Sequence, residues 1–444
     1  MPRMSRRSAS RRERLIRGLV ARLPFYYGWI ILACVCAAGF SRQGPAVATL
    51  SIFVTPMSAE FGWSRTELSA AVSIGGILGA LAAPFLGPVL DRNGARALLG
   101  FSVLTTGITL ILLAYTPSLA VFYLLYCFAR MNFAAPYDLG IYGSNVNWFV
   151  RRRAFVNAIT TLAQMLGLVA MPLIAQAVIE AAGWRSAWLA IGATVLAVGL
   201  LPIWLLHVRR PEDLGLRPDG EPAPAHGAAP FAADAPAPAG HAEPTFSRRE
   251  ALATPAFWLL SLFTLLAYPV QSGISLHQAP FFIERGLPAA TAATAVSLFA
   301  ACSAASGLAF GFWPRRLSVR FALALVALLL ASSSLLMLAA CDRLGAYAAS
   351  ALFGLGIGGL LTVLPIAWAD FFGRRSFGAI RGIALTVQVS AQAAGPVVSA
   401  LLRDATGRYD ASLATFAVMS AAALAAALLA RPPAEAGRTA PQAG

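Results

Sequence analysis

Charged side chains are rare in the long apolar segments of this sequence, and the few that occur there have the chemistry to bind an anion. Arg42 and Arg130 each lie well inside such a segment. An ionisable group in an apolar setting is costly, and a guanidinium matches a carboxylate with two parallel hydrogen bonds. The two arginines therefore predict an electropositive cavity. The alternative is a structural role, in which each pairs with a helix carbonyl or with an acid of another helix.

Asp138 is the clearest acid within an apolar segment. It follows Arg130 by eight residues, so on a regular helix with 100° per residue it would point about 80° away from Arg130. Two roles stay open for its carboxylate: carrier of a proton, or counter-ion for Arg42. Tyr137 follows Arg130 by seven residues and would share its face, where a hydroxyl could lie beside a bound anion.

Amide side chains recur at helical spacing in the later apolar segments. Gln271 belongs to a polar stripe with members three or four residues apart, and Gln388 lies four residues before Gln392. Residues at this spacing share one face of a helix. Gln388 also follows Gln164 by 224 positions, the offset of an internal repeat. We expect Gln271 and Gln388 to line a central cavity. The alternative is hydrogen bonding between helices, which membrane bundles use routinely.

The composition is that of a membrane protein. Of the residues, 58% are hydrophobic and 12% charged, whereas soluble domains carry about 25% charged residues. The net charge of +15 does not indicate nucleic-acid binding, because the arginines cluster in short loops between apolar segments. The five cysteines lack metal-ligand spacing, so no metal or cofactor is expected. No nucleophile and base occur in a catalytic pattern, so the sequence does not predict an enzyme.

About twelve apolar segments are long enough to cross a bilayer, which takes about 20 residues each. Residues 208–250, rich in Pro, Ala and charge, divide them six and six and are typical of a flexible linker. We expect an all-α membrane protein with two pseudo-symmetric six-helix bundles, at 28–207 and 251–430. Residues 1–27 would form an Arg-rich N-terminus and 431–444 a tail. The segments lie at about 28–53, 67–90, 97–115, 119–147, 154–180, 187–207, 254–279, 291–312, 321–341, 344–370, 378–402 and 412–430.

The loops predict the orientation of the chain. Loops with several arginines alternate with loops that hold one or none, and arginine-rich loops face the cytoplasm. Both termini and the linker are therefore expected on the cytoplasmic side of the inner membrane. The halves also repeat, since Gly62 and Gly286, like Gly87 and Gly311, are 224 positions apart. A constant offset fits two parallel units related by an axis normal to the membrane.

One loop between two apolar segments carries a family motif. In the stretch 87–96, glycine would permit close helix approach and a tight reversal, and the charged residues would bind helix ends. The motif residues are Gly87, Asp91, Arg92, Gly94 and Arg96. This G-x-x-x-D-R-x-G-x-R pattern resembles the loop between helices 2 and 3 of the major facilitator superfamily. The second copy is degenerate, with Arg315 where the acid would stand.

Two further segments resemble one branch of that superfamily. Tyr27-Gly-Trp29 and the stretch 208–220 are similar to the monocarboxylate-transporter and oxalate–formate-antiporter branch. The resemblance implies transport of a small organic anion, coupled to a proton or to a counter-substrate, by alternating access. Members of the branch commonly carry a charged residue in helix 8 that contacts the carboxylate, but the corresponding segment 291–312 has none. The charged residue of the segment 378–402, Arg381, lies near a predicted helix end. Carboxylate recognition is therefore expected mainly from the N-terminal half.

Three functional readings remain in order of support. The first is a secondary active transporter of a small organic anion, such as a monocarboxylate, acting as a monomer in the lipid bilayer. The second is an efflux pump for drugs or other metabolites, although the glycine-proline pattern of such pumps in the fifth helix is poorly matched by Met171-Pro172. The third is a membrane sensor or enzyme, for which the chain offers neither a soluble domain nor a catalytic cluster.

Overall fold

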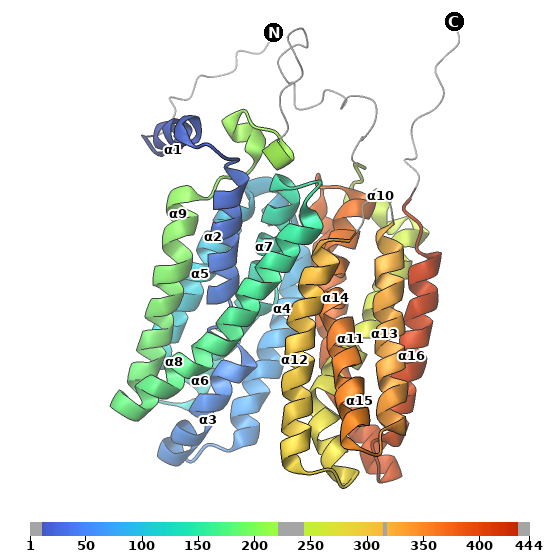
Figure 1. The fold of residues 1–444 in the computed structure, drawn as a ribbon. Helices are drawn as coiled ribbons and strands as arrows, with labels where there is room; N and C mark the ends of the chain where they lie inside the picture. Colours follow the sequence, from blue (N-terminus) through green and yellow to red (C-terminus); the bar gives the residue numbers. More distant parts are fainter. Residues whose placement is uncertain (1–10, 221–243, 314–317, 434–444) are drawn as a thin grey trace, which may run out of the picture.

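Helices make up every regular element in the described part of the chain, as the all-α prediction requires. The computed structural model describes residues 11–220, 244–313 and 318–433 (Figure 1). The degenerate second motif around Arg315 and parts of the predicted linker and termini lie outside these residues. Ten described helical segments are long and apolar enough to cross a membrane.

The first half begins with α1 (Arg11–Arg22), which lies across the helix ends beside the linker (Figure 1). Its bundle is built from helices broken at Gly and Pro. These are α2 (Gly28–Ser41), α3 (Val47–Phe61), α4 (Arg65–Asn93), α5 (Ala95–Leu113), α6 (Leu119–Ala134), α7 (Pro136–Trp148), α8 (Arg153–Val195), the π-helical turn η1 (Leu196–Leu200) and α9 (Leu201–Leu206). The short 3-10 turns η2 (Pro211–Leu214) and η3 (Pro218–Gly220) follow.

Two predicted single helices are interrupted in mid-membrane. The first predicted span consists of α2 and α3, which are separated by residues 42–46, including Gly44 and Pro45. The fourth consists of α6 and α7, because Pro136 has no N–H and disfavours a helical Ala135, whose φ and ψ are −123° and −65°. Conversely, the fifth and sixth spans form one 54-residue segment that reverses at Gly183, where φ is +81°. Counting crossings in this way gives the predicted twelve.

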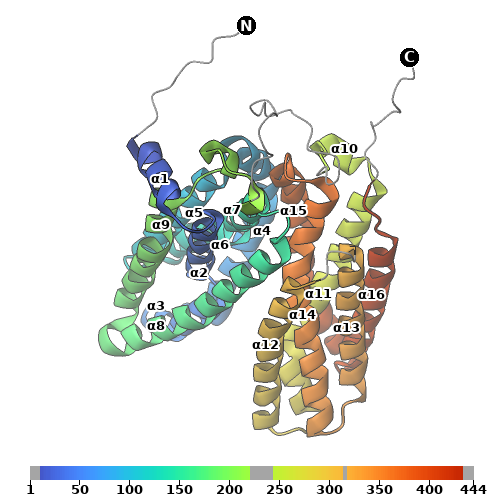
Figure 2. The same cartoon turned by 45° about the horizontal axis from the view of Figure 1, so that its top comes forward.

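The second half repeats the architecture with fewer interruptions. After a short α10 (Arg248–Leu252), its six long helices are α11 (Pro255–Glu284), α12 (Ala289–Gly311), α13 (Val319–Ala339), α14 (Arg343–Phe372), α15 (Phe377–Thr406) and α16 (Asp410–Leu429). We call the end of the bundle that carries α1, the linker turns and the C-terminal end of α16 the linker side. Figure 2 shows the two halves close together at the linker side and diverging away from it.

Small residues bring the halves into contact at the linker side. A Cβ on Gly87 of α4 would lie 2.1 Å from the carbonyl oxygen of Gly378 in α15, so only glycine permits this approach. The symmetry-related contact uses Gly311 of α12, where a Cβ would lie 2.7 Å from Ala158 of α8. The offset of 224 positions in the sequence therefore corresponds to two equivalent helix crossings, one on each side of the interface.

Asp91 adds a charged contact to the first crossing. Its two carboxylate oxygens accept hydrogen bonds from the backbone N–H groups of Gly378 and Ala379, at 2.8 and 2.9 Å. These are first-turn N–H groups of α15, which have no partner within their own helix and carry its positive dipole end. The motif acid of one half thus caps a helix of the other half.

Other motif residues hold the linker. The backbone at Gly94 has φ of +82°, and a Cβ there would meet the Arg209 side chain at 2.5 Å. Arg209 donates to the Asp91 carbonyl at 2.7 Å, and Arg96 donates to the Trp204 carbonyl at 3.1 Å. Arg92 is exposed. The turn of the motif and the start of the linker are therefore one packed unit.

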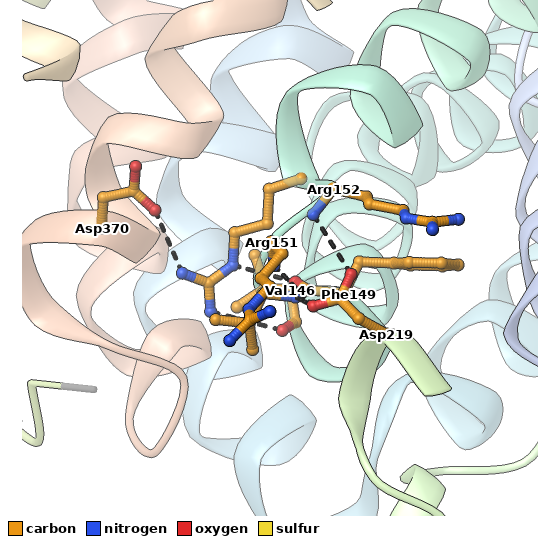
Figure 3. A network of polar contacts seen from close by, with 8 residues as sticks. Val146, Phe149, Arg151, Arg152, Asp219 and Asp370 are labelled. Carbon is orange, nitrogen blue, oxygen red and sulfur yellow. Dashed lines mark hydrogen bonds and ion pairs between the residues drawn. The ribbon is translucent and has the colours of Figure 1, made fainter. Parts of the chain in front are cut away.

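Polar contacts near the second crossing join further elements. Buried Arg153 at the start of α8 pairs with Asp370 of α14 at 3.1 Å, and it also donates to the Phe149 carbonyl. Asp219 of the linker accepts from the backbone N–H groups of the loop between α7 and α8, including that of Arg152 at 3.1 Å (Figure 3). Arg374 pairs with Glu212 of the linker at 2.6 Å. The linker therefore contacts both halves.

Asp91→Asn should weaken the closed linker side. The amide keeps one acceptor but loses the charge at the N-terminus of α15, a loss of about 1–2 kcal/mol. That corresponds to roughly a 5- to 30-fold shift toward separation of the linker-side ends. Spin labels at Asn93 and Arg375, in a background without the five native cysteines, would report the distance between the halves. Arg92→Gln, at the exposed neighbouring position, is the control, and an identical distance distribution in both variants would contradict the prediction.

Candidate functional site

The break between α2 and α3 positions Arg42. The guanidinium extends from the end of α2, where its Nε donates to the Phe133 carbonyl and its Nη1 to the Gln164 amide oxygen, both at 2.9 Å. Phe133 lies in the last turn of α6, whose carbonyls lack partners within the helix. Two interrupted helices therefore meet here, and the side chain of Arg42 satisfies one of the carbonyls that the second interruption leaves open.

Asp138 joins charges from both halves. It lies in the first turn of α7, where the helix dipole favours an acid, and its side chain is 5% exposed. One oxygen lies 3.7 Å from Nη1 of Arg42, and the other lies 3.2 Å from Nη2 of Arg381 in α15. Asp138 therefore lies where the counter-ion role would place it, one of the two roles left open by the sequence, and it has a second partner in the other half.

Arg381 is the functional candidate that sequence reasoning missed. It lies only four residues into α15, so it was expected near a solvated helix end, but its side chain is 1% exposed. The cause is the close packing of α15 on α4, where a Cβ on Gly382 would lie 2.5 Å from the Ala83 carbonyl oxygen. Its seven-residue spacing from Gln388 was an available signal, because the two side chains hydrogen-bond at 2.8 Å.

Arg130 adds a third guanidinium beside Arg42. The two guanidinium carbons lie 4.1 and 4.5 Å from the centre of the same Phe133 ring. Gly75 of α4 makes room for Arg130, since a Cβ there would lie 2.5 Å from the Arg130 Cβ. The Nε and Nη1 atoms of Arg130 are buried and have no hydrogen-bond partner. Among the described residues, no acceptor satisfies these two donors.

We call Arg42, Arg130, Arg381 and Asp138 the central charged group. Three cations and one anion leave an excess of two positive charges in the middle of an apolar bundle. The Nε and Nη1 atoms of Arg381 are also buried without a partner. Since a buried cation without a counter-ion is costly, the arrangement favours an anion that would complete it. Chemically, the group can hold a carboxylate through charge-assisted hydrogen bonds.

The other predicted site residues lie at varying distances from this group. Gln388 contacts the group by accepting a hydrogen bond from Arg381. Gln271 of α11 instead accepts a 3.4 Å hydrogen bond from Gln392, within the second half. Tyr137 is fully enclosed and faces Thr106 of α5, because the break at Pro136 removes the helical register that would have aligned it with Arg130. In the described part of the chain, no hydrogen bond joins Tyr137 to an arginine.

Comparison with known proteins identifies the family. The sequence profile of the Major Facilitator Superfamily matches residues 29–396. The chain belongs to this superfamily. With its ten described apolar helical segments, it is a multi-pass membrane protein. A solved structure of a superfamily transporter, FucP in the outward conformation, aligns with a TM-score of 0.70 over 91% of this chain and 100% of that one. The sequences are 13% identical, so this likeness shows the fold alone.

Curated relatives match this chain over part or most of its length. The membrane sensor protein UhpC of Salmonella typhimurium is 31% identical over 223 residues, which are 48% of each chain. The chain thus spans about half the length of this relative. Monocarboxylate transporter 12 of Rattus norvegicus is 24% identical over 420 residues, covering 87% of this chain and 82% of that protein. Among the described residues, no three His, Cys, Asp or Glu side chains group together as metal ligands.

Asp138→Asn should destabilise the protein by about 3–5 kcal/mol, because it leaves buried Arg42 and Arg381 without the acid that pairs with both. The double variant Asp138→Asn/Arg381→Gln should recover part of that loss, since it removes one uncompensated cation. Denaturant unfolding of these two variants and of the single variant Arg381→Gln would measure the losses, in a chloride-poor buffer so that a free anion does not replace the carboxylate. A double variant that loses the sum of the two single losses would show that the two residues are not coupled.

Proposed function

We propose that this transporter moves a small organic anion, of the monocarboxylate type, by alternating access. The observation that carries the proposal is the excess of two positive charges in the central charged group, together with the unpartnered donors of Arg130. A carboxylate bound by Arg130 and Arg42 would satisfy these donors and reduce the excess charge. The similarity over most of the chain to a protein named as a monocarboxylate transporter supports this substrate class.

The proposed orientation places the linker side in the cytoplasm and the protein in the inner (plasma) membrane. It rests on the several-arginine loops at this end, which would face the cytoplasm. The structure then corresponds to a state closed toward the cytoplasm, in which the anion reaches the central charged group from outside. Each chain carries a whole site, so we propose that the monomer is the functional unit.

The central charged group also suggests a coupling step. Asp138 holds Arg381 across the interface between the halves. An entering carboxylate would compete with Asp138 for the guanidinium groups, and a carboxylate that loses a cationic partner binds a proton more readily. Protonated Asp138 would release Arg381 and allow the halves to separate at the linker side. Transport is coupled to protons if this proton crosses the membrane with the anion. Transport is exchange if a second anion takes the place of the first for the return step.

A sensor role is the second candidate, because the relative with the highest identity of those described above is named as a membrane sensor. A sensor would bind the same anion without moving it at a significant rate. Efflux of cationic drugs is disfavoured, since the excess positive charge of the site repels a cation. Binding and flux measured on the same preparation separate these functions.

Arg130→Gln should weaken anion binding by about 10- to 100-fold, because a charge-assisted hydrogen bond contributes about 1.5–3 kcal/mol. Thermal unfolding of the purified protein against small carboxylates and their uncharged amides would reveal the ligand. At 100 times its dissociation constant, a ligand stabilises the folded state by about 2.7 kcal/mol. Arg92→Gln removes one exposed arginine and is the matched control.

Uptake of that carboxylate into proteoliposomes then tests transport. We expect uptake by the wild-type chain and by the Arg92→Gln control, and little uptake by Arg130→Gln. Stabilisation by amides as strong as that by carboxylates would contradict an anion site. Binding without flux would favour the sensor.

A further inference from the structure

A basic pocket lies on the linker side of the first half, away from the central charged group. It encloses about 640 Å³ between α1, the start of α5, the end of α9 and the turn η2. This volume is in the range of ligand pockets, about 300–1,000 Å³. Four arginines and one acid contribute its charge, which gives an excess of three positive charges. They are Arg12, Arg17, Arg96, Arg209 and Asp213.

The helix α1 closes one side of this pocket. It lies across the ends of the membrane helices near α9 (Figure 1). Ile16 packs into the core and is 4% exposed, whereas neighbouring Leu15 is 68% exposed and Arg17 is exposed. Arginines beside apolar residues on one short helix are typical of a helix at the membrane surface. The pocket therefore lies where lipid head groups meet the protein.

The helix end in the pocket does not repel an anion. The last carbonyls of α9 carry the negative end of its dipole, but arginines occupy them. Arg12 donates to the Trp204 and His207 carbonyls at 3.1 and 2.6 Å, and Arg96 donates to the Trp204 carbonyl. Burial, with the nearby charges of Arg96 and Arg12, lowers the pKa of His207 to about 3, so this side chain is neutral. The charge of the pocket is therefore that of its four arginines and Asp213.

An apolar wall continues from the pocket along the outside of the bundle. Phe101 of α5 and Trp204 of α9 line the pocket and are 53% and 58% exposed, and Leu205 is 53% exposed. Tryptophan favours the boundary between head groups and acyl chains. A soluble phosphate compound would use the arginines and leave this wall bare, whereas a phospholipid would use both.

We propose that this pocket binds the phosphate head group of an anionic phospholipid, with the acyl chains along Phe101 and Trp204. The phosphate lies among Arg17, Arg96 and Arg209, whose charges it neutralises. In the proposed orientation this lipid belongs to the cytoplasmic leaflet. The bound lipid ties α1 to the ends of α5 and α9 and so stabilises this corner of the first half.

Native mass spectrometry of the purified full chain with phosphatidylglycerol tests the proposal. Arg17→Gln/Arg96→Gln should retain at least tenfold less phosphatidylglycerol than the wild-type chain. The control Arg248→Gln/Arg249→Gln removes two exposed arginines on α10, on the same side but outside the pocket, and should retain the lipid like wild type. Phosphatidylcholine should bind weakly to all three proteins. An equal loss in both double variants would overturn the proposal, because it would show diffuse attraction to the surface.

Two further arms separate lipid from soluble phosphate and guard against misfolding. Glycerol 3-phosphate, which has the head-group charge without acyl chains, should bind at least tenfold more weakly than phosphatidylglycerol; equal binding would overturn the lipid assignment. If the double variant does not fold, Arg17→Gln alone changes one exposed side chain of α1 and should lower lipid retention about threefold. Full retention of phosphatidylglycerol by this single variant would also overturn the proposal.

Discussion

The ion bridge from Arg42 through Asp138 to Arg381 is the interaction on which the rest of the structure depends. It joins both halves in the apolar interior, at a level where two of the helices are interrupted. The interruptions position the residues of the bridge. They bring Arg42 and a carbonyl of α6 together and place Asp138 in the first turn of α7. The bridge remains unbalanced, since Arg130 and Arg381 keep buried donors without partners. Such an imbalance favours an anionic ligand and couples its binding to the contact between the halves.

A second set of contacts holds the two halves together at the linker side. There the halves approach through glycine contacts that admit no side chain, and Asp91 caps α15 with a single carboxylate. These contacts are strong in one geometry and are lost on separation, because hydrogen bonds and close packing depend steeply on distance. Contacts of this kind suit the alternating access that we propose, in which the interface passes between two discrete arrangements. Both contacts act on α15, which the helix cap joins to α4 and the charged bridge joins to α7.

Patterns that depend on bilayer thickness and periodicity were sufficient to predict the fold class and the twelve crossings. The 224-position offset also anticipated that Gly87 and Gly311 occupy equivalent crossings. Periodicity could not predict the mid-membrane breaks, because these depend on single residues such as Pro136. For the same reason it could not predict which way the side chains of Tyr137 and Asp138 point after the break. Arg381 was missed for a related reason: distance from a helix end along the sequence suggested exposure, whereas burial depends on the neighbouring helix and on Gly382. The sequence showed which charged residues lie in apolar segments, but the residues that they contact depend on how the helices pack in three dimensions.

In the function that we propose, a carboxylate completes the central charged group. An electron cryomicroscopy structure of the protein with the small carboxylate that stabilises it most would show whether it does. We expect carboxylate density about 3 Å from the guanidinium of Arg130, with Asp138 farther from at least one of its two arginines than in the unliganded protein. Density for the carboxylate at another place, with the bridge unchanged and the Arg130 donors still unpartnered, would contradict the account.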